Sequence, residues 1–327
     1  MKNILFFFII LMGAIIISNT AASHFNKFIS GEAFYALMDE TKPYLIKEFN
    51  MGTSGKLKVK TSGGSINVVG QNGNTIKVEM YVRKANGGFF GKSSDSDIAK
   101  ALESYDINIS KDGNTVSAIA ESKGWSWSSK NNMSISFTVY VPFEISSDLN
   151  TSGGSINLTD LRGDQKVHTS GGSINCKEVD GDLKAHTSGG SINVENYQGV
   201  LDATTSGGSI KLKNANGKLK VHTSGGGISL NEVSGSIDAG TSGGSINADI
   251  KKLEASLSLK TSGGSINATV PAGQGVDLDL KGSRVNTQLM NFNGKTERDK
   301  IVGSMNGGGI PVKLSTSGGH VNLNFRN

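Results

Sequence analysis

Residues 151–193 read TSGGSINLTDLRGDQKVHTSGGSINCKEVDGDLKAHTSGGSIN, and the hexamer Thr-Ser-Gly-Gly-Ser-Ile returns in them every 18 residues. The hexamer or a close variant begins at Thr61, Thr151, Thr169, Thr187, Thr205, Thr223, Thr241, Thr261 and Thr316. A fixed period of this length indicates one structural unit that is stacked many times. We therefore number the positions of each repeat from its threonine, position 1, to position 18.

Apolar residues occupy alternate positions of the repeat. Position 6 holds Ile156, Ile174, Ile192, Ile210, Ile228 and Ile246, and position 8 holds Leu158, Cys176, Val194, Leu212, Leu230 and Ala248. Positions 11, 15 and 17 are also mostly apolar, whereas their neighbours are mostly Lys, Asp, Asn, Ser or His. Alternation over short runs is typical of strands with one buried face. We predict that these positions form the core.

A second symmetry divides each repeat into halves, because glycines at positions 4 and 13 are each followed by apolar residues two and four places later. Each half reads as a glycine turn followed by a short strand. The fold predicted is therefore all-β: a flattened parallel β-solenoid of 18-residue, two-strand coils, with two facing parallel sheets and capped ends. A three-sided hexapeptide helix would need apolar residues at positions 12 and 18, which are polar.

Departures from the period define the expected domain boundaries. We expect a signal peptide at 1–22, an N-terminal segment or cap at 23–44, and one solenoid domain at 45–327. Within that domain we expect an irregular insert at about 84–133, with a short helix from Ser96 to Ser104, and a C-terminal cap at about 270–327. Helix-like spacing is also seen from Gly31 to Glu40.

The first residues predict export. Lys2 precedes an apolar run from Ile4 to Ile17, and Thr20-Ala21-Ala22 supplies small residues for cleavage. The run is shorter than the roughly 20 residues of a membrane-spanning helix. We expect the mature protein in the periplasm, on the outer cell surface or secreted, without a transmembrane segment.

Composition excludes several classes of protein. The 33 Lys+Arg and 28 Asp+Glu are too balanced to favour nucleic acid as a partner. Cys176 is the only cysteine, which rules out an intrachain disulfide. No phosphate-binding loop, HExxH or GxSxG motif occurs, and no carboxylate pair is suitably arranged for acid/base catalysis. We predict a protein without catalytic residues or a cofactor, and therefore not an enzyme.

The layout resembles that of a known family. The first strands from Leu57 to Val69, the segment ISFTVYVP at 135–142, the TSGGSIN repeats and the closing TSGGHVNLNF at 316–325 are similar to the bacterial putative-adhesin family, also called the toastrack domain. The resemblance covers about residues 45–327. It implies a β-solenoid of exported or envelope-attached proteins, with roles in adhesion or, when joined to membrane segments, in envelope stress signalling. It implies no catalytic residues.

A few residues are candidates for specific binding. His168, His186 and His222 share position 18, so the first two should stack one strand spacing apart, where imidazoles could bind a metal. The alternative is a solvent-facing polar ladder, because no carboxylate or cysteine completes a ligand set. Trp125 and Trp127 alternate as on one face of a strand, and either stack on sugar rings or cover an edge of the solenoid.

Two functions follow from this reading. The first is a surface or secreted binding module, whose repeated Ser, Asn, Thr and Lys ladders contact glycans or another cell-surface protein. The second is a periplasmic or envelope structural or regulatory protein that binds a membrane partner. In both cases we expect a monomer. An ice binder is disfavoured, because the outward positions mix Lys, His and Ser.

Overall fold

The structure is a computed structural model, and it describes residues 42–51, 55–84, 95–124 and 133–326. The chain divides into two units at Lys42 and Pro43, and the described elements belong to the second unit. The Gly31 to Glu40 segment, Trp125 and Trp127 lie outside the described residues. Within the described ranges, no helix combines the length and apolar character required to cross a membrane.

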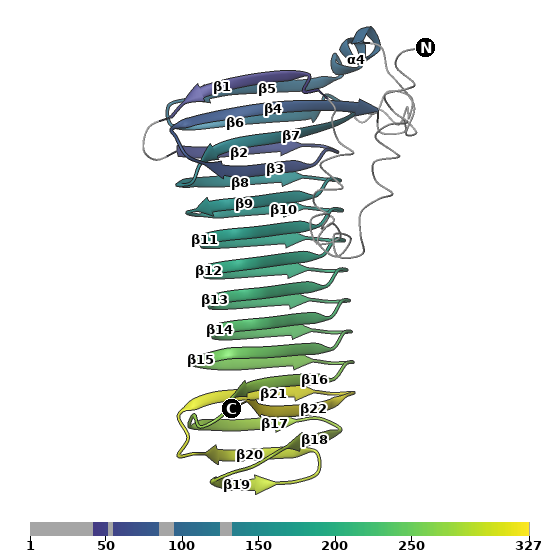
Figure 1. The fold of residues 1–327 in the computed structure, drawn as a ribbon. Coiled ribbons are helices and arrows are strands. Elements are labelled where there is room, and N and C mark those ends of the chain that lie inside the picture. Colours follow the sequence, from purple (N-terminus) through teal and green to yellow (C-terminus); the bar gives the residue numbers. More distant parts are fainter. Residues whose placement is uncertain (1–41, 52–54, 85–94, 125–132, 327) are drawn as a thin grey trace, which may run out of the picture. The chain divides into compact units, whose positions relative to one another are not determined.

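The N-terminal part contains one helix and mixed parallel and antiparallel strands (Figure 1). Its elements are β1 (Leu45–Asn50), β2 (Gly55–Thr61), β3 (Ile66–Gln71), β4 (Thr75–Lys84), α4 (Asp95–Leu102), β5 (Tyr105–Asp112), β6 (Thr115–Ser122) and β7 (Met133–Pro142). Helix α4 confirms the short helix expected near Ser96. The other described residues of the expected insert form the antiparallel hairpin β5–β6 and the start of β7.

The central part is a regular stack of parallel strands. It contains β8 (Ile145–Thr151), β9 (Ile156–Arg162), β10 (Gln165–Thr169), β11 (Ile174–Thr187), β12 (Ile192–Thr205), β13 (Ile210–Thr223), β14 (Ile228–Thr241) and β15 (Ile246–Thr261). Ile174 of β11 is the register partner of Ile192 in β12, and Ile192 is the partner of Ile210 in β13. Residues 18 apart therefore lie on neighbouring parallel strands, as the repeat predicts.

The C-terminal part continues the stack and then reverses direction. It contains β16 (Ile266–Pro271), β17 (Val276–Lys281), β18 (Arg284–Thr287), β19 (Phe292–Thr296), β20 (Lys300–Met305), β21 (Ile310–Thr316) and β22 (His320–Arg326). Strands β17 and β19 pair antiparallel with β20, whereas β21 and β22 pair in parallel with the central stack. Across the described residues the fold is all-β, largely parallel and built from repeating strands.

Each full repeat from β11 to β15 is one long strand rather than the two separate strands that the glycine at position 13 suggests. The chain still bends inside the strand, because position 10 is left-handed, as at Glu178 with φ 53°, and Gly181 at position 13 has φ 112°. Pairing continues through the bend, with Gly181 opposite Gly199. A side chain at Gly217 would lie 2.0 Å from the Gly199 carbonyl oxygen, so only glycine permits this approach.

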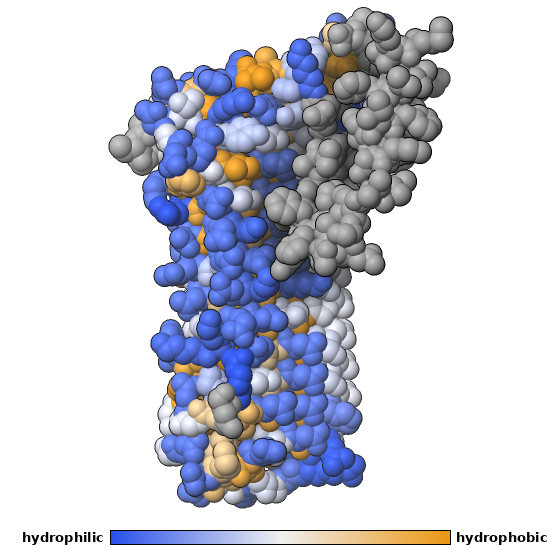
Figure 2. Space-filling view, viewed as in Figure 1, coloured by the Kyte–Doolittle hydropathy of each residue, from blue (hydrophilic) through white to orange (hydrophobic). Residues whose placement is uncertain are grey.

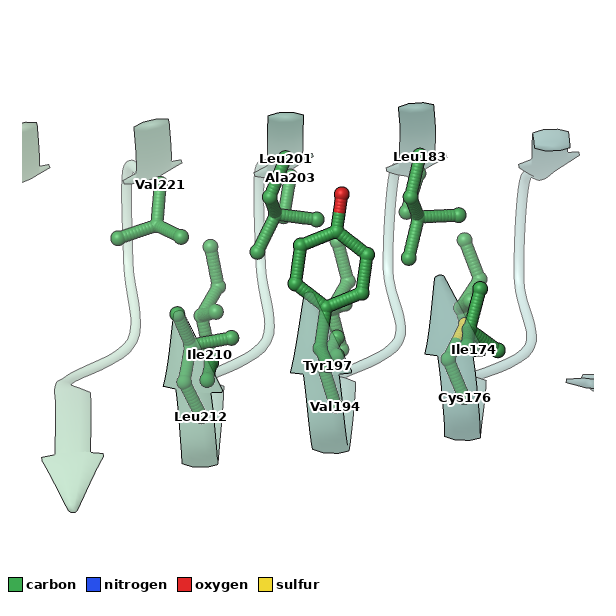
Figure 3. Packing of buried hydrophobic residues seen from close by; sticks show 14 of the residues in the cluster. Ile174, Cys176, Leu183, Val194, Tyr197, Leu201, Ala203, Ile210, Leu212 and Val221 are labelled. Carbon is green, nitrogen blue, oxygen red and sulfur yellow. The ribbon is translucent and has the colours of Figure 1, made fainter. Parts of the chain in front are cut away.

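The two halves of each repeat face each other across the core (Figure 3). In this view Ile174 and Cys176 project from one row of strand segments towards Leu183 in the opposite row. These side chains are at most 3% exposed, in agreement with the predicted core positions. Tyr197 fills position 11 of its repeat and spans the gap, and its hydroxyl donates a hydrogen bond to the Gly181 carbonyl oxygen (2.6 Å).

Both ends of the stack depart from sequence order. Thr61 is the register partner of Thr151, so the repeat that begins at Thr61 lies directly beside one that begins 90 positions later in the sequence. Strand β2 lies between β6 and β8, and β3 lies between β7 and β9. At the other end β21 lies between β15 and β17, and β22 lies between β16 and β18. Each terminal repeat is thus held inside the ladder.

Candidate binding surfaces

The threonine of the hexamer is a buried structural residue. Thr187 is 0% exposed, its hydroxyl donates to the Gly172 carbonyl oxygen at 2.8 Å, and it accepts a hydrogen bond from the Gly190 amide at 3.2 Å. The same donor contact recurs along the stack, and position 1 is buried in every repeat from Thr61 to Thr316. The expectation that these threonines contribute to an exposed ladder is therefore wrong, because their hydroxyls are used to close the turn.

The serines at position 2 form an exposed row along one edge of the stack. Thr151 is adjacent to Thr61 and Thr316 is adjacent to Thr261 in register, so the row is continuous through both terminal repeats. Its members are Ser62, Ser152, Ser170, Ser188, Ser206, Ser224, Ser242, Ser262 and Ser317. Ser62 is half-buried and the others are exposed. Glycine follows each of them, so no neighbouring side chain at position 3 covers the hydroxyls.

Asparagines at position 7 form a second row on the outer face. The Asn175 amide donates to the Asn157 carbonyl oxygen at 2.8 Å, and the Asn193 amide donates to Asn175 at the same distance. A second run joins Asn247, Asn267, Asn322 and Asn286. Lys211 and Ser229 interrupt the row between the two runs. Each amide satisfies part of its hydrogen-bonding capacity within the ladder and leaves the rest facing outward.

Two of the three candidate histidines come together. The rings of His168 and His186 stack with centroids 5.1 Å apart and planes 3° apart. Partial burial lowers the pKa of His168, and the neighbouring His186 and Lys166 lower it further. His222 is separated from His186 by Thr204 and faces Gly240 on the next strand. Among the described residues, no three His, Cys, Asp or Glu side chains are grouped so as to hold a metal ion.

Cys176 is a core residue. It is 3% exposed at position 8, and burial raises the pKa of its thiol to about 12. A thiol that stays protonated at neutral pH is a poor nucleophile and a poor metal ligand. Cys176 therefore fits the role of a small apolar side chain in the stack.

Some ladder charges in the middle of the stack are neutralised by the neighbouring repeat. Lys213 lies 2.6 Å from Glu195, and Lys220 lies 3.3 Å from Asp202. These exposed pairs contribute little to stability, roughly 0–1 kcal/mol each. They nevertheless remove net charge locally. Hydrophilic side chains predominate on the face in view in Figure 2.

A groove of about 660 Å³ interrupts this regular surface near the N-terminal end of the stack. It crosses the beginnings of β6, β2, β8 and β10 and reaches the middle of β11. Its charged lining residues are Lys56, Asp148, Asp164, Lys166, Asp182 and Lys184. The sequence did not reveal this groove, because it depends on the contact between the repeat at Thr61 and the repeat at Thr151, which are 90 residues apart.

Comparisons with known proteins find a family and solved structures to which this chain is similar. The family model described as Toastrack DUF4097 matches residues 47–324. A crystal structure of a putative adhesin from Bacteroides fragilis is 15% identical, with a TM-score of 0.42, and the match covers 86% of this chain and 98% of that chain. A putative cell adhesion protein from Clostridium sporogenes is 12% identical, with a TM-score of 0.20 over 87% of this chain and 100% of that chain. No curated protein matches.

Proposed function

Because the chain belongs to the Toastrack DUF4097 family, we propose that it is an exported, non-catalytic β-solenoid that acts as a binding module at the cell surface. Its flattened coils present two facing parallel sheets, and irregular caps close both ends. The exported location follows from the leader sequence predicted at residues 1–22. The ligands proposed are glycans or another protein of a cell surface or envelope.

The observation that carries this proposal is the unbroken serine row at position 2. Ser152, Ser188 and Ser224 belong to one row, and within the described residues their hydroxyls make no side-chain hydrogen bond. Parallel pairing repeats these groups every ~4.8 Å along a rigid support. Many weak, equally spaced contacts produce strong overall binding when they act together, because later contacts form at high effective concentration.

Deleting whole repeats tests the multivalent character of the binding. Removing residues 187–222 takes out two repeats and joins His186 to Thr223, which preserves the register. We expect binding to a glycan array to weaken by at least about tenfold, because fewer contacts act together. The shortened protein should still unfold cooperatively, and this control shows that weaker binding is not caused by misfolding. Equal binding by both proteins would contradict multivalency.

Location is tested on whole cells. Protease treatment of intact cells should remove the native protein, and antibodies against it should label the same cells. Protection from protease in intact cells, together with cleavage after the outer membrane is opened, would contradict a surface role. That result would instead support an envelope protein with a membrane partner.

A further inference from the structure

The groove near the N-terminal end gathers several charged side chains within a short length of the stack. Lys56, Asp164, Lys166, Asp182 and Lys184 line it, and all five are exposed. Among the described residues none of the five forms an ion pair or a side-chain hydrogen bond, whereas Lys213 and Lys220 of a later repeat each pair with a carboxylate, at 2.6 and 3.3 Å. The groove therefore holds charged groups that remain available to a ligand.

Like charges also lie on neighbouring strands in this groove. Lys166 of β10 is the direct register partner of Lys184 in β11, and on its other side it is the register partner of Asp148 in β8. Asp164 and Asp182 immediately precede the next register pair, Gln165 and Leu183, so they too are neighbours. Like charges directly opposite each other destabilise a sheet. A ligand that places an anion beside the lysines and hydrogen-bond donors beside the aspartates would relieve both repulsions.

The floor of the groove is fixed in place. Gln165 is 1% exposed and stands where later repeats have leucine or isoleucine. It accepts a hydrogen bond from the Ser147 hydroxyl (2.5 Å) and donates to the Ile145 carbonyl oxygen (2.7 Å). These polar groups are satisfied within the protein. The charges above them therefore stand on a rigid support, which lowers the ordering cost of binding.

The backbone in the groove cannot accept an added strand. Strand β2 is paired with β6 and β8, and β10 is paired with β8 and β11. Both edges of each strand are thus occupied, so a peptide cannot bind here by adding a strand to the sheet. Recognition has to come from side chains. The groove crosses five strands, a length of about 19 Å at the usual strand spacing.

We propose that this groove is a binding site for an anionic polysaccharide. Lys166 and Lys184 bind a carboxylate or sulfate group of the sugar chain. Lys56, which lies on β2 at the other side of β8, binds a second anionic group of the same chain. The carboxylates of Asp164 and Asp182 accept hydrogen bonds from sugar hydroxyls between these anionic groups. This inference rests on the proposed binding function and assigns it a ligand class and a place in the stack.

The test measures binding by isothermal titration calorimetry with the whole exported protein. The probes are polygalacturonate, dextran sulfate, neutral dextran and polyglutamate, at about 0.15 M salt, where contacts between distant exposed charges are screened. We expect binding of at least one anionic polysaccharide and at least tenfold weaker binding of dextran and polyglutamate. The variant K166Q/K184Q should lose at least tenfold in affinity, and D164N/D182N should lose affinity as well.

The matched control is K213Q/K220Q, which removes two lysines from the paired ladders outside the groove and should change affinity less than twofold. Equal losses in the control and in K166Q/K184Q would overturn the site, because attraction would then depend on total charge. Equal binding of polyglutamate would overturn the carbohydrate assignment. If array glycans bind the protein and K166Q/K184Q retains that binding, the groove assignment fails while the binding function stands. No binding to any glycan overturns both.

Discussion

The centre and the two ends of the stack use the same repeat in different ways. From β8 to β15 the order of strands in space follows the order in sequence, and all pairing is parallel. At each end the terminal repeat lies one layer inside, and antiparallel strands lie outside it. A regular parallel stack with open edges could pair with further strands, and we expect these irregular ends to oppose that.

The N-terminal end shows how an open edge is protected. Among the residues that the structure describes, β1 pairs only with β4 and β5 pairs only with β6. The Lys47 ammonium donates to the Ile109 carbonyl oxygen at 2.8 Å, and the Lys111 ammonium donates to the Asn50 carbonyl oxygen at 2.6 Å. Lysines on edge strands oppose pairing with another chain. We therefore expect these lysines to disfavour the addition of a further strand at this edge.

Removing the last strand should have the largest effect. Truncation before His320 deletes β22, which lies between β16 and β18 and carries Arg326. Arg326 also bridges Glu232 (3.1 Å) and Asp249 (3.0 Å) from two repeats. We expect amides of β16 and β18 to lose hydrogen-exchange protection, with β11 to β13 unchanged. Retained protection in β18 would show that β22 is an outer strand.

A glycine substitution in the centre should be the next most harmful. A side chain at Gly190 would lie 2.0 Å from the Gly172 carbonyl oxygen, so G190A must separate two repeats. We expect a loss of more than about 3 kcal/mol in the free energy of unfolding, measured in urea. The neighbouring Gly189 has room, with its closest contact at 3.5 Å, and G189A should cost less than about 1 kcal/mol. Similar losses of unfolding free energy in G190A and G189A would contradict the close approach of Gly190 to the Gly172 carbonyl oxygen.

A substitution at position 10 should stabilise the centre. Glu178 has φ 53°, a left-handed conformation that asparagine adopts more readily. Asn196 and Asn214 occupy the same position and join by a 2.8 Å hydrogen bond. We expect E178N to raise the free energy of unfolding by roughly 0.5 kcal/mol, and E178A to lower it. The Asn196 amide donates a hydrogen bond to the Glu178 carboxylate at 2.6 Å, and destabilisation by E178N would show that this contact outweighs backbone strain.

The stacked histidines should give the smallest effect, a dependence of stability on pH. The pKa of His168 is lowered in the folded state by burial and by His186 and Lys166, so the unfolded chain binds the proton more readily. Stability should therefore fall as pH decreases below the ordinary histidine pKa of about 6.5. The H168N variant, which copies Asn150 of the preceding repeat, should show a smaller fall in melting temperature between neutral and acidic pH. An equal fall in melting temperature in H168N and in the unchanged protein would show that the histidine pair is not the source of the pH dependence.

The sequence was sufficient to predict the centre of the stack, because one 18-residue period sets both the register and the buried positions. It predicted the contact of His168 with His186 for the same reason. It did not predict that the threonine at position 1 is buried, because its hydroxyl pairs with a carbonyl oxygen of another repeat. The arrangement of the ends and the groove depends on contacts between distant repeats, such as Thr61 with Thr151. The 18-residue period does not indicate which distant repeats are neighbours, so these features could not be predicted from the sequence.

The distance between labels at Ser62 and Ser224 tests the stack most directly. Both positions belong to the serine row, and spin labels at S62C and S224C, with C176A to remove the buried thiol, allow the distance to be measured by pulsed electron paramagnetic resonance. The repeat at Thr61 lies directly beside the repeat at Thr151, which places the labels five strand spacings apart, about 24 Å. A distance near 43 Å, which nine successive spacings would give, would contradict this arrangement.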